Sequence, residues 1–179
     1  MKNKISVLDQ KHYLIIRENI HSFLTTCAGT YDTPGLLLDI APQIHEGARA
    51  YFSKAKIETL DIEIASKSNY VADICKNNNH IIPAKKYDFV VCTEVLEHTL
   101  QPFAAIQEIF RILKPGGLLF LSVPFNFRIH GPLPDCWRFT EHGLRALLIN
   151  FKIIKLDLLD TKSRWLMPIH YTVVARKNK

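Results

Sequence analysis

The stretch YDFVVCTEVLEH (residues 87–98), with RILKPGG (residues 111–117) after it, decides the fold. Its first half is a short apolar run without alternation, which is typical of a strand buried on both faces of a parallel sheet. Helical spacing follows, because Pro102 suits a first helical turn and the basic, proline- and glycine-containing stretch 114–117 ends the helix. A strand followed by a crossover helix predicts an α/β protein.

The segments on either side repeat this pattern. Apolar runs predict strands, and residues 48–52 and a helix capped by Thr140 predict helical segments between them. The predicted strands besides 87–92 are 36–40, 57–62, 70–74, 118–123, 151–159 and 170–175. Alternation of strands and helices predicts a mostly parallel sheet with helices on both faces.

Residues 1–35 differ from the rest of the chain. Apolar residues recur there with an approximately helical rhythm until residues 28–35 break it with glycine and proline. We therefore expect an N-terminal helical segment (1–35) and a Rossmann-like core (36–179), which together form a single domain (1–179).

Composition excludes several functions. Hydrophobic residues make up 47% of the chain, but no apolar run reaches the roughly 18–20 residues that span a bilayer. The N-terminus lacks the apolar stretch of a signal peptide, so we expect a cytoplasmic protein without membrane contact. The net charge is +6, but the basic residues are scattered, which argues against nucleic-acid binding. The oligomeric state stays open.

Cysteine and histidine spacing argues against a metal site. The four cysteines lie far apart with no C-x-x-C pair, which indicates reduced thiols. The eight histidines form no H-x-x-x-H pair and no Cys–His spacing of a zinc site. The sequence therefore predicts no metal.

Acidic residues follow consecutive predicted strands. Asp39, Asp61 and Asp73 end the first three strands, and Thr93 and Glu94 follow the fourth. Ligands of an open α/β sheet bind at these strand ends, and carboxylates accept strong hydrogen bonds from a ribose diol or an adenine amino group. The seven glycines form neither a G-x-G motif nor a P-loop to hold a phosphate. A phosphate-free adenosine ligand fits best, and S-adenosylmethionine is one.

The stretches 87–98 and 108–117 resemble the class I methyltransferases that depend on S-adenosylmethionine, particularly the small type 11 family. The resemblance extends from about residue 36 to residue 151. It implies a Rossmann-like three-layer sandwich with a mostly parallel seven-stranded sheet and a final antiparallel strand, here 170–175. It also implies S-adenosylmethionine as the cofactor.

The resemblance implies a role for each acidic strand end. Asp39 would lie near the methionine moiety, Asp61 would bind the ribose hydroxyls, and Asp73 would lie on the adenine side. Ile74 would pack on the adenine ring, and the segment from Thr93, with Glu94, would line the methionine end.

The chain departs from the family in the loop after the first strand. The family carries a Gly-x-Gly-x-Gly loop there, whereas this chain has Ala41, Pro42 and Gln43. Ala41 still allows close backbone approach, but Pro42 has no N–H to donate. Gln43 offers a side-chain amide to the cofactor carboxylate instead.

Two histidines and the loop 125–139 are the candidates for the acceptor side. His98 after strand 87–92 and His130 in the loop are candidate bases, which methyl transfer needs only if the acceptor enters protonated. Arg128 and Arg138 are candidate ligands of an acidic acceptor, with Trp137 beside them. The alternatives are a helix-start histidine at 98, locally paired arginines, and a tryptophan that serves as a lid or packs in the core.

Three functions compete on these observations. The first is methyl transfer to a small polar acceptor, such as a sugar or another metabolite in a biosynthetic pathway. The second is a catalytically degenerate S-adenosylmethionine-binding partner subunit, which the glycine-poor loop favours. The third is an NAD-dependent oxidoreductase, which the missing phosphate-binding turn disfavours.

Overall fold

A seven-stranded sheet with the order β3-β2-β1-β4-β5-β7-β6 forms the centre of the protein. The computed structural model describes residues 5–43, 46–161 and 163–178, so residues 1–4 of the predicted N-terminal segment lie outside it. The strands are β1 (Leu36–Ile40), β2 (Lys56–Asp61), β3 (Tyr70–Val71), β4 (Tyr87–Thr93), β5 (Leu113–Pro124), β6 (Phe151–Leu159) and β7 (His170–Lys177).

Strand direction follows the prediction of a mostly parallel sheet. The pairs β3–β2, β2–β1, β1–β4 and β4–β5 are parallel. Strand β7 lies antiparallel between β5 and β6, which confirms the final antiparallel strand. The strand order reverses between β1 and β4, and ligands of such sheets bind at the carboxyl ends of the strands flanking that point.

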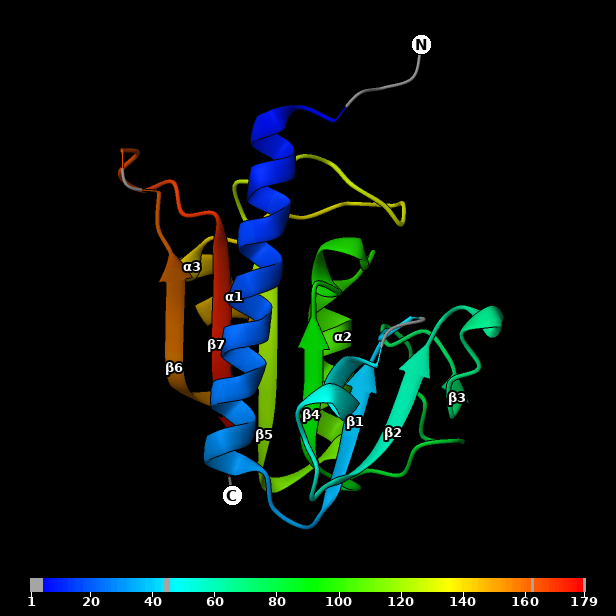
Figure 1. Ribbon diagram of the computed structural model, residues 1–179. Helices are drawn as coiled ribbons and strands as arrows, with labels where there is room; N and C mark the ends of the chain where they lie inside the picture. Colours follow the sequence, from blue (N-terminus) through cyan, green and yellow to red (C-terminus); the bar gives the residue numbers. More distant parts are fainter. Residues whose placement is uncertain (1–4, 44–45, 162, 179) are drawn as a thin grey trace.

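Helices cover both faces of the sheet, which makes three layers. Helix α1 (Val7–Tyr31) crosses the front face in Figure 1, and α2 (Pro102–Ile112) and α3 (Glu141–Leu147) lie behind the sheet. Short 3₁₀ helices, η1 (Gly47–Ala50), η2 (Ile64–Ser66) and η3 (Leu96–His98), follow β1, β2 and β4.

Alternate side chains of the central strands fill two separate cores. Phe89 and Val91 of β4, with Phe120 of β5, pack in the core beneath α1. Val90 and Cys92 face the opposite side and join the core that contains the buried faces of α2 and α3. Both faces of β4 are therefore apolar, which explains why its sequence shows no alternation.

Three predicted boundaries differ from the structure. Helix α1 continues through Gly29 to Tyr31, and the chain turns at Asp32, whose carboxylate accepts backbone N–H groups of residues 53–55. Strand β3 is only two residues long, because Asp73 accepts the N–H of Cys75 in a local turn. Strand β5 begins at Leu113, so the stretch 114–117 lies inside a strand that pairs with β4.

Of the other two predicted helical segments, one agrees with the structure and one is shorter than predicted. Thr140 caps α3 by accepting the N–H of Gly143, as predicted. Residues 48–52 form only the short turn η1. Among the described residues, no helix is long and apolar enough to cross a membrane.

Candidate active site

A cavity of about 490 Å³ lies at the carboxyl ends of β1 and β4, where the strand order reverses. Its walls come from α1, the loop after β1, the end of β4 and the loop after β5. The predicted site residues that line it are Asp39, Ala41, Gln43, Thr93, Glu94, His98 and His130. A groove of about 640 Å³ between α1, β6 and β7 is larger, but no predicted site residue lines it. The smaller cavity is therefore the candidate active site.

Asp39 marks one end of this cavity, which we call the donor end. Its side chain is buried, and its Oδ2 accepts the N–H of Ala48 at 2.7 Å. Burial raises the pKa of Asp39 to about 6, although that hydrogen bond and the charge of Arg49 act in the opposite direction. The carboxylate is therefore ionised at neutral pH and faces a cavity large enough for a cationic group.

Gly47 makes the approach of Asp39 to η1 possible. It adopts a φ of 55°, and a Cβ at this position would lie 2.1 Å from Asp39 Oδ2 and 2.8 Å from Pro42 Cβ. Only glycine fits there without displacing the acid. Sequence reasoning missed Gly47, because it follows Asp39 at a longer spacing than the family's glycine-rich loop.

The loop after β1 adopts glycine-like backbone angles without glycine. Ala41 has a φ of 53° and Gln43 a φ of 55°, in the left-handed region that disfavours side chains. Ala41 also donates its N–H to the carbonyl of Leu60 at 2.7 Å, which ties the loop to β2. Two non-glycine residues therefore hold these angles at the cost of local strain.

Asp61 has an unused oxygen. Its Oδ1 accepts the N–H of Glu63 at 2.9 Å, whereas its buried Oδ2 has no hydrogen-bond partner in the described part of the chain. Buried carboxylate oxygens are rarely left without a donor, so this atom calls for a ligand. A ribose hydroxyl supplies such a donor, which fits S-adenosylmethionine. Asp61 itself does not line the cavity, so its contact with the ribose stays a prediction.

The predicted adenine-side residues lie outside the cavity walls. Asp73 accepts the N–H of Cys75 at 2.8 Å and is half-buried. Ile74 is buried in the core on the α2 side of the sheet. Neither residue lines the cavity, so their contact with an adenine ring stays a prediction.

Glu94 is held in place by a buried chain of hydrogen bonds. Its Oε1 accepts from Ser122 Oγ at 2.8 Å and lies 2.8 Å from Nε2 of the fully buried His170. The amide nitrogen of Asn19 on α1 lies 2.7 Å from Nδ1 of His170. Because the amide only donates, Nδ1 accepts and Nε2–H donates to Glu94. Sequence reasoning did not single out Asn19 or His170 as site residues.

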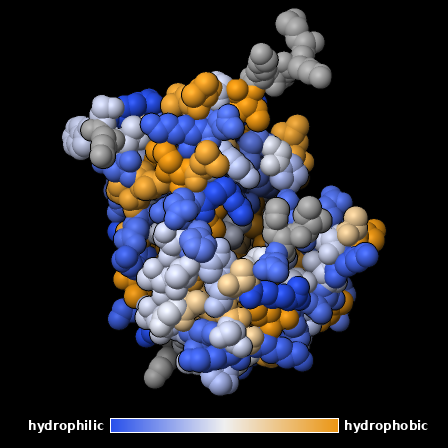
Figure 2. All heavy atoms as spheres, viewed as in Figure 1, coloured by the Kyte–Doolittle hydropathy of each residue, from blue (hydrophilic) through white to orange (hydrophobic). Residues whose placement is uncertain are grey.

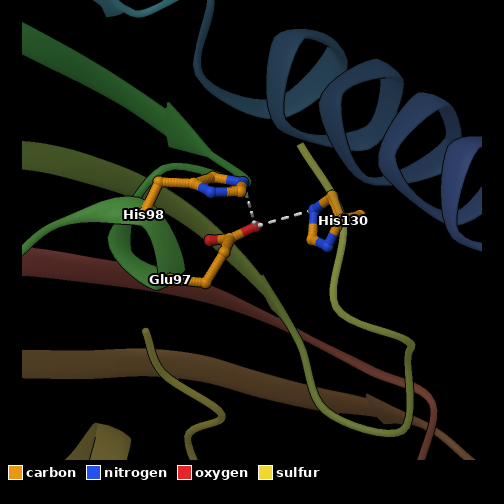
Figure 3. A group of neighbouring side chains, drawn as sticks. All are labelled: Glu97, His98 and His130. Carbon is orange, nitrogen blue, oxygen red and sulfur yellow. Dashed lines mark ion pairs between the residues drawn. The ribbon is translucent and has the colours of Figure 1, made fainter. Parts of the chain in front are cut away.

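His98 and His130 line another part of the cavity, which we call the acceptor end, and the carboxylate of the fully buried Glu97 lies close to both rings. Oε1 of Glu97 lies 3.8 Å from Nε2 of His98 and 3.9 Å from Nε2 of His130. Figure 3 shows both rings directed at this carboxylate, His98 beside it on the turn η3 and His130 from the loop after β5. The structure therefore brings the two predicted candidate bases together, and it adds Glu97, which sequence reasoning did not name as a site residue.

Backbone contacts fix the loop of His130 to η3. The N–H groups of Cys136 and Trp137 both lie within hydrogen-bonding distance of the carbonyl of Glu97. Trp137 also donates its indole N–H to the carbonyl of Thr99 at 2.8 Å. Trp137 is thus an anchor of this loop, and its predicted contact with the acceptor is untested.

The surroundings of His130 set its protonation. Its Nδ1 lies 3.0 Å from Oδ2 of Asp135, and the same oxygen accepts its backbone N–H at 2.9 Å. Burial lowers the pKa of His130, with Asp135 opposing this effect. Burial acts to raise the pKa of Asp135, but hydrogen bonds from Arg138 and His130 outweigh it and lower that pKa to about 2. His130 is therefore neutral at pH 7 and can accept a proton.

The predicted acceptor-binding arginines have local partners. Arg138 donates to both oxygens of Asp135, with Nη2 at 2.8 Å from Oδ2. Arg128 is exposed and donates to the neighbouring carbonyl of Ile129. Neither lines the cavity, so an acidic acceptor bound by these side chains stays a prediction.

Comparison with known proteins identifies a family. The chain matches the family described as "Methyltransferase domain" over residues 12–174. It is similar to the ubiquinone biosynthesis O-methyltransferases of Xanthomonas oryzae pv. oryzae, with 33% identity over 85 residues, and of Haemophilus ducreyi, with 33% over 87 residues. Each match covers 48% of this chain but only 31% and 30% of the relative, so the chain spans less than a third of these relatives.

Solved structures show the same fold. A methyltransferase from Methanosarcina mazei gives a TM-score of 0.65 at 18% identity and covers 89% of this chain and 97% of its own. A Burkholderia thailandensis N1-methyltransferase, solved with 1,6-didemethyltoxoflavin and S-adenosylhomocysteine, gives 0.64 at 14% identity over 100% and 94%. The family match over nearly the whole described chain, the strand order and the unused oxygen of Asp61 agree. The chain belongs to the methyltransferase domain family, with the class I Rossmann-like fold and S-adenosylmethionine as its methyl donor.

Proposed function

We propose that the chain transfers the methyl group of S-adenosylmethionine to a hydroxyl oxygen of a small polar acceptor. The observation that carries this proposal is the cavity with two chemically different ends. Asp39 lies at the donor end, and the neutral His130 faces His98 and Glu97 at the acceptor end. Both ends belong to one space of about 490 Å³, which is within the usual range of small-molecule sites.

Bound S-adenosylmethionine supplies an electrophilic methyl group, which passes to the acceptor oxygen as the S–C bond breaks and the O–C bond forms. The residues of the chain position the two partners in line, which supplies much of the rate of a displacement. The hydroxyl proton needs an acceptor, and Nε2 of His98 or His130 faces the place where it is released.

A hydroxyl acceptor fits this end better than an acidic one. The polar atoms gathered there are carboxylate oxygens and imidazole nitrogens, whereas Arg138 is paired with Asp135. The curated relatives above are named as O-methyltransferases, which agrees with a hydroxyl acceptor. A sugar remains one candidate within this class.

Apolar side chains are exposed on two segments that also supply walls of the cavity, although those named below do not line it. Exposed apolar side chains on the N-terminal half of α1 and on the loop 125–139 are Val7, Leu8, Leu14, Ile129 and Leu133. Figure 2 shows apolar surface gathered at this upper end of the molecule. An acceptor with an apolar part beside its hydroxyl would bury this surface on binding.

A second candidate function is a non-catalytic subunit that binds S-adenosylmethionine. The observation that favours it is the strained loop at Ala41 and Gln43, which lacks the glycines of the family. The two candidates agree on cofactor binding and differ only on turnover.

Calorimetric titration with S-adenosylmethionine, followed by methyl-release assays on sugar, phenol and amine pools, tests both candidates. We expect binding and methyl release with hydroxyl acceptors. Asp61→Ala should weaken cofactor binding by roughly 100-fold, because the unused oxygen is lost. The matched control is Asp157→Asn, a half-exposed carboxylate on β6 that is paired with Lys155 and should leave binding unchanged.

Three outcomes would revise the proposal. Binding without methyl release to any pool would favour the non-catalytic subunit. Release only with the amine pool would contradict the hydroxyl acceptor. No binding to the wild-type protein, or equal affinity of Asp61→Ala, would overturn the cofactor site itself.

A further inference from the structure

Glu97 is a buried carboxylate without any donor. Its side chain is 0% exposed, and neither Oε1 nor Oε2 has a hydrogen-bond partner among the described residues. The 3.8 Å and 3.9 Å separations from His98 and His130 are too long for hydrogen bonds. An unpaired buried carboxylate is strongly unfavourable, so some positive group or proton has to compensate it.

Both histidines direct a hydrogen-bond-accepting nitrogen at Glu97. Nδ1 of His98 lies 3.0 Å from the carbonyl of Pro134, which can only accept, so this nitrogen carries the hydrogen. Nδ1 of His130 lies 3.0 Å from the Asp135 carboxylate and 3.3 Å from the carbonyl of Arg128, so it carries the hydrogen as well. Each Nε2 therefore presents a lone pair to the same carboxylate.

Three atoms with lone pairs therefore point at one another, and neither histidine supplies a hydrogen between them. The ligating atoms of Glu97, His98 and His130 all lie within 4.8 Å of one another. A single proton on Glu97 can satisfy only one of these contacts. The charged groups nearby do not compensate the Glu97 carboxylate. The guanidinium of Arg138 is paired with Asp135, and Glu94 adds negative charge.

We propose that Glu97, His98 and His130 bind a divalent first-row transition-metal ion such as Zn²⁺ at the acceptor end of the cavity. A donor set of two imidazoles and one carboxylate favours such ions over Mg²⁺. Three protein ligands leave further coordination positions of the ion open. Ligand bonds of about 2.1 Å require these atoms to close in by less than about 1 Å. The hydrogen bonds from Nδ1 of each histidine to a carbonyl or carboxylate are typical of metal-ligating histidines.

The ion would have a defined role if the proposed methyl transfer holds. His98 and His130 line the cavity, so an ion between them and Glu97 meets the acceptor from its wall. With Nε2 of both histidines engaged as its ligands, the ion would replace them in activating the acceptor, because it would supply Lewis-acid chemistry that lowers the pKa of the hydroxyl. Metal binding itself does not depend on this role.

The test is metal titration of the full chain after removal of bound metal with a chelator. Co²⁺ serves as a visible-absorbance probe and Zn²⁺ as its competitor, both without S-adenosylmethionine. We expect one Co²⁺ per chain with an absorption band that Zn²⁺ displaces. Glu97→Gln should weaken binding by at least about 100-fold, and His130→Gln by a similar factor. The control is His142→Asn, which removes an exposed histidine on α3 and should leave the titration unchanged.

Thermal unfolding distinguishes the loss of metal binding from the loss of the folded structure. We expect Zn²⁺ to raise the Tm of the wild-type protein but not of Glu97→Gln. In chelator, Glu97→Gln should melt at or above the wild-type temperature, because a neutral amide replaces a buried ionisable carboxyl group that has no hydrogen-bond partner among the described residues. A folded wild-type protein that binds neither ion at millimolar concentration, or equal binding by wild type and Glu97→Gln, would overturn the site. Metal binding without methyl release would instead count against the proposed function alone.

Discussion

The donor end and the acceptor end of the cavity are built in different ways. At the donor end, the conformation of the backbone determines the shape of the site, because Ala41, Gln43 and Gly47 adopt positive φ angles around Asp39. At the acceptor end, side chains carry it, because Glu97, His98 and His130 converge from the turn η3 and the loop after β5.

This difference predicts how each end responds to substitution. A backbone-built end depends on which residues tolerate a left-handed conformation, so adding or removing a single Cβ has a large effect. A side-chain-built end depends on ligand chemistry, so isosteric changes such as Glu97→Gln affect it without disturbing the fold. Each prediction below separates these two kinds of dependence.

Gly47→Ala should have the largest effect at the donor end. The added Cβ would lie 2.1 Å from Asp39 Oδ2, so the acid or the turn η1 must move. We expect the affinity for S-adenosylmethionine, measured by calorimetry, to fall by roughly 100-fold. The Co²⁺ titration should change little, because the acceptor end is built from other segments.

The matched control for this prediction is Gly29→Ala in α1. A Cβ there meets nothing within 4 Å, and alanine favours a helix over glycine by about 1 kcal/mol. Gly29→Ala should therefore raise stability and leave cofactor binding intact. If both variants bind the cofactor as the wild type does, Gly47 is not a determinant of the donor end.

The pH dependence of cofactor binding should follow Asp39. Burial raises the pKa of Asp39 to about 6, and an ionised carboxylate attracts the cationic methyl donor. Affinity is therefore full above pH 7 and falls about tenfold between pH 7 and pH 5, as the acid takes up a proton. Calorimetry across this range measures the fall.

Asp39→Asn provides the control for the pH profile. It removes the titrating group, so its affinity should be lower at pH 7 but should no longer fall by the same factor toward pH 5. A variant profile parallel to that of the wild type would assign the pH dependence to another group.

Asn19→Ala should have a smaller effect on cofactor binding, transmitted through the side chains of His170 and Glu94. It removes the donor that fixes the tautomer of His170, which in turn donates to Glu94. The loss of one such hydrogen bond predicts roughly fivefold weaker cofactor binding. Glu18→Ala, on an exposed neighbouring position of α1, should bind as the wild type does. Equal affinities of the two variants would show that this chain of hydrogen bonds does not affect cofactor binding.

Much of the fold followed from short-range patterns in the sequence. The apolar runs of β4 and β5 and the cap at Thr140 depend on local spacing, and the structure confirms each of them. The boundaries of α1 and β3 did not follow, because Asp32 and Asp73 end those elements through side-chain hydrogen bonds that composition does not reveal.

The site was predictable only where it followed the strand ends. Asp39, Thr93 and Glu94 line the cavity because they end β1 and β4, the strands at the reversal of order. The grouping of Glu97, His98 and His130 depends on the path of the loop after β5, which no local spacing encodes. The sequence therefore predicted no metal site, and the grouping of three side chains that could ligate an ion is visible only in the structure.

Ala41→Gly should have the smallest effect and the opposite sign. Alanine in the left-handed region costs about 1 kcal/mol or more, and glycine removes that strain while it adds about 0.5–1 kcal/mol of unfolded-state entropy. We expect a net stabilisation of roughly 0.5 kcal/mol in denaturant unfolding and unchanged or tighter cofactor binding. Ala104→Gly, at a half-buried position inside α2, should instead destabilise by about 1 kcal/mol. If both variants lost the same stability, Ala41 would carry no strain, and the donor end would owe its shape to side-chain contacts as the acceptor end does.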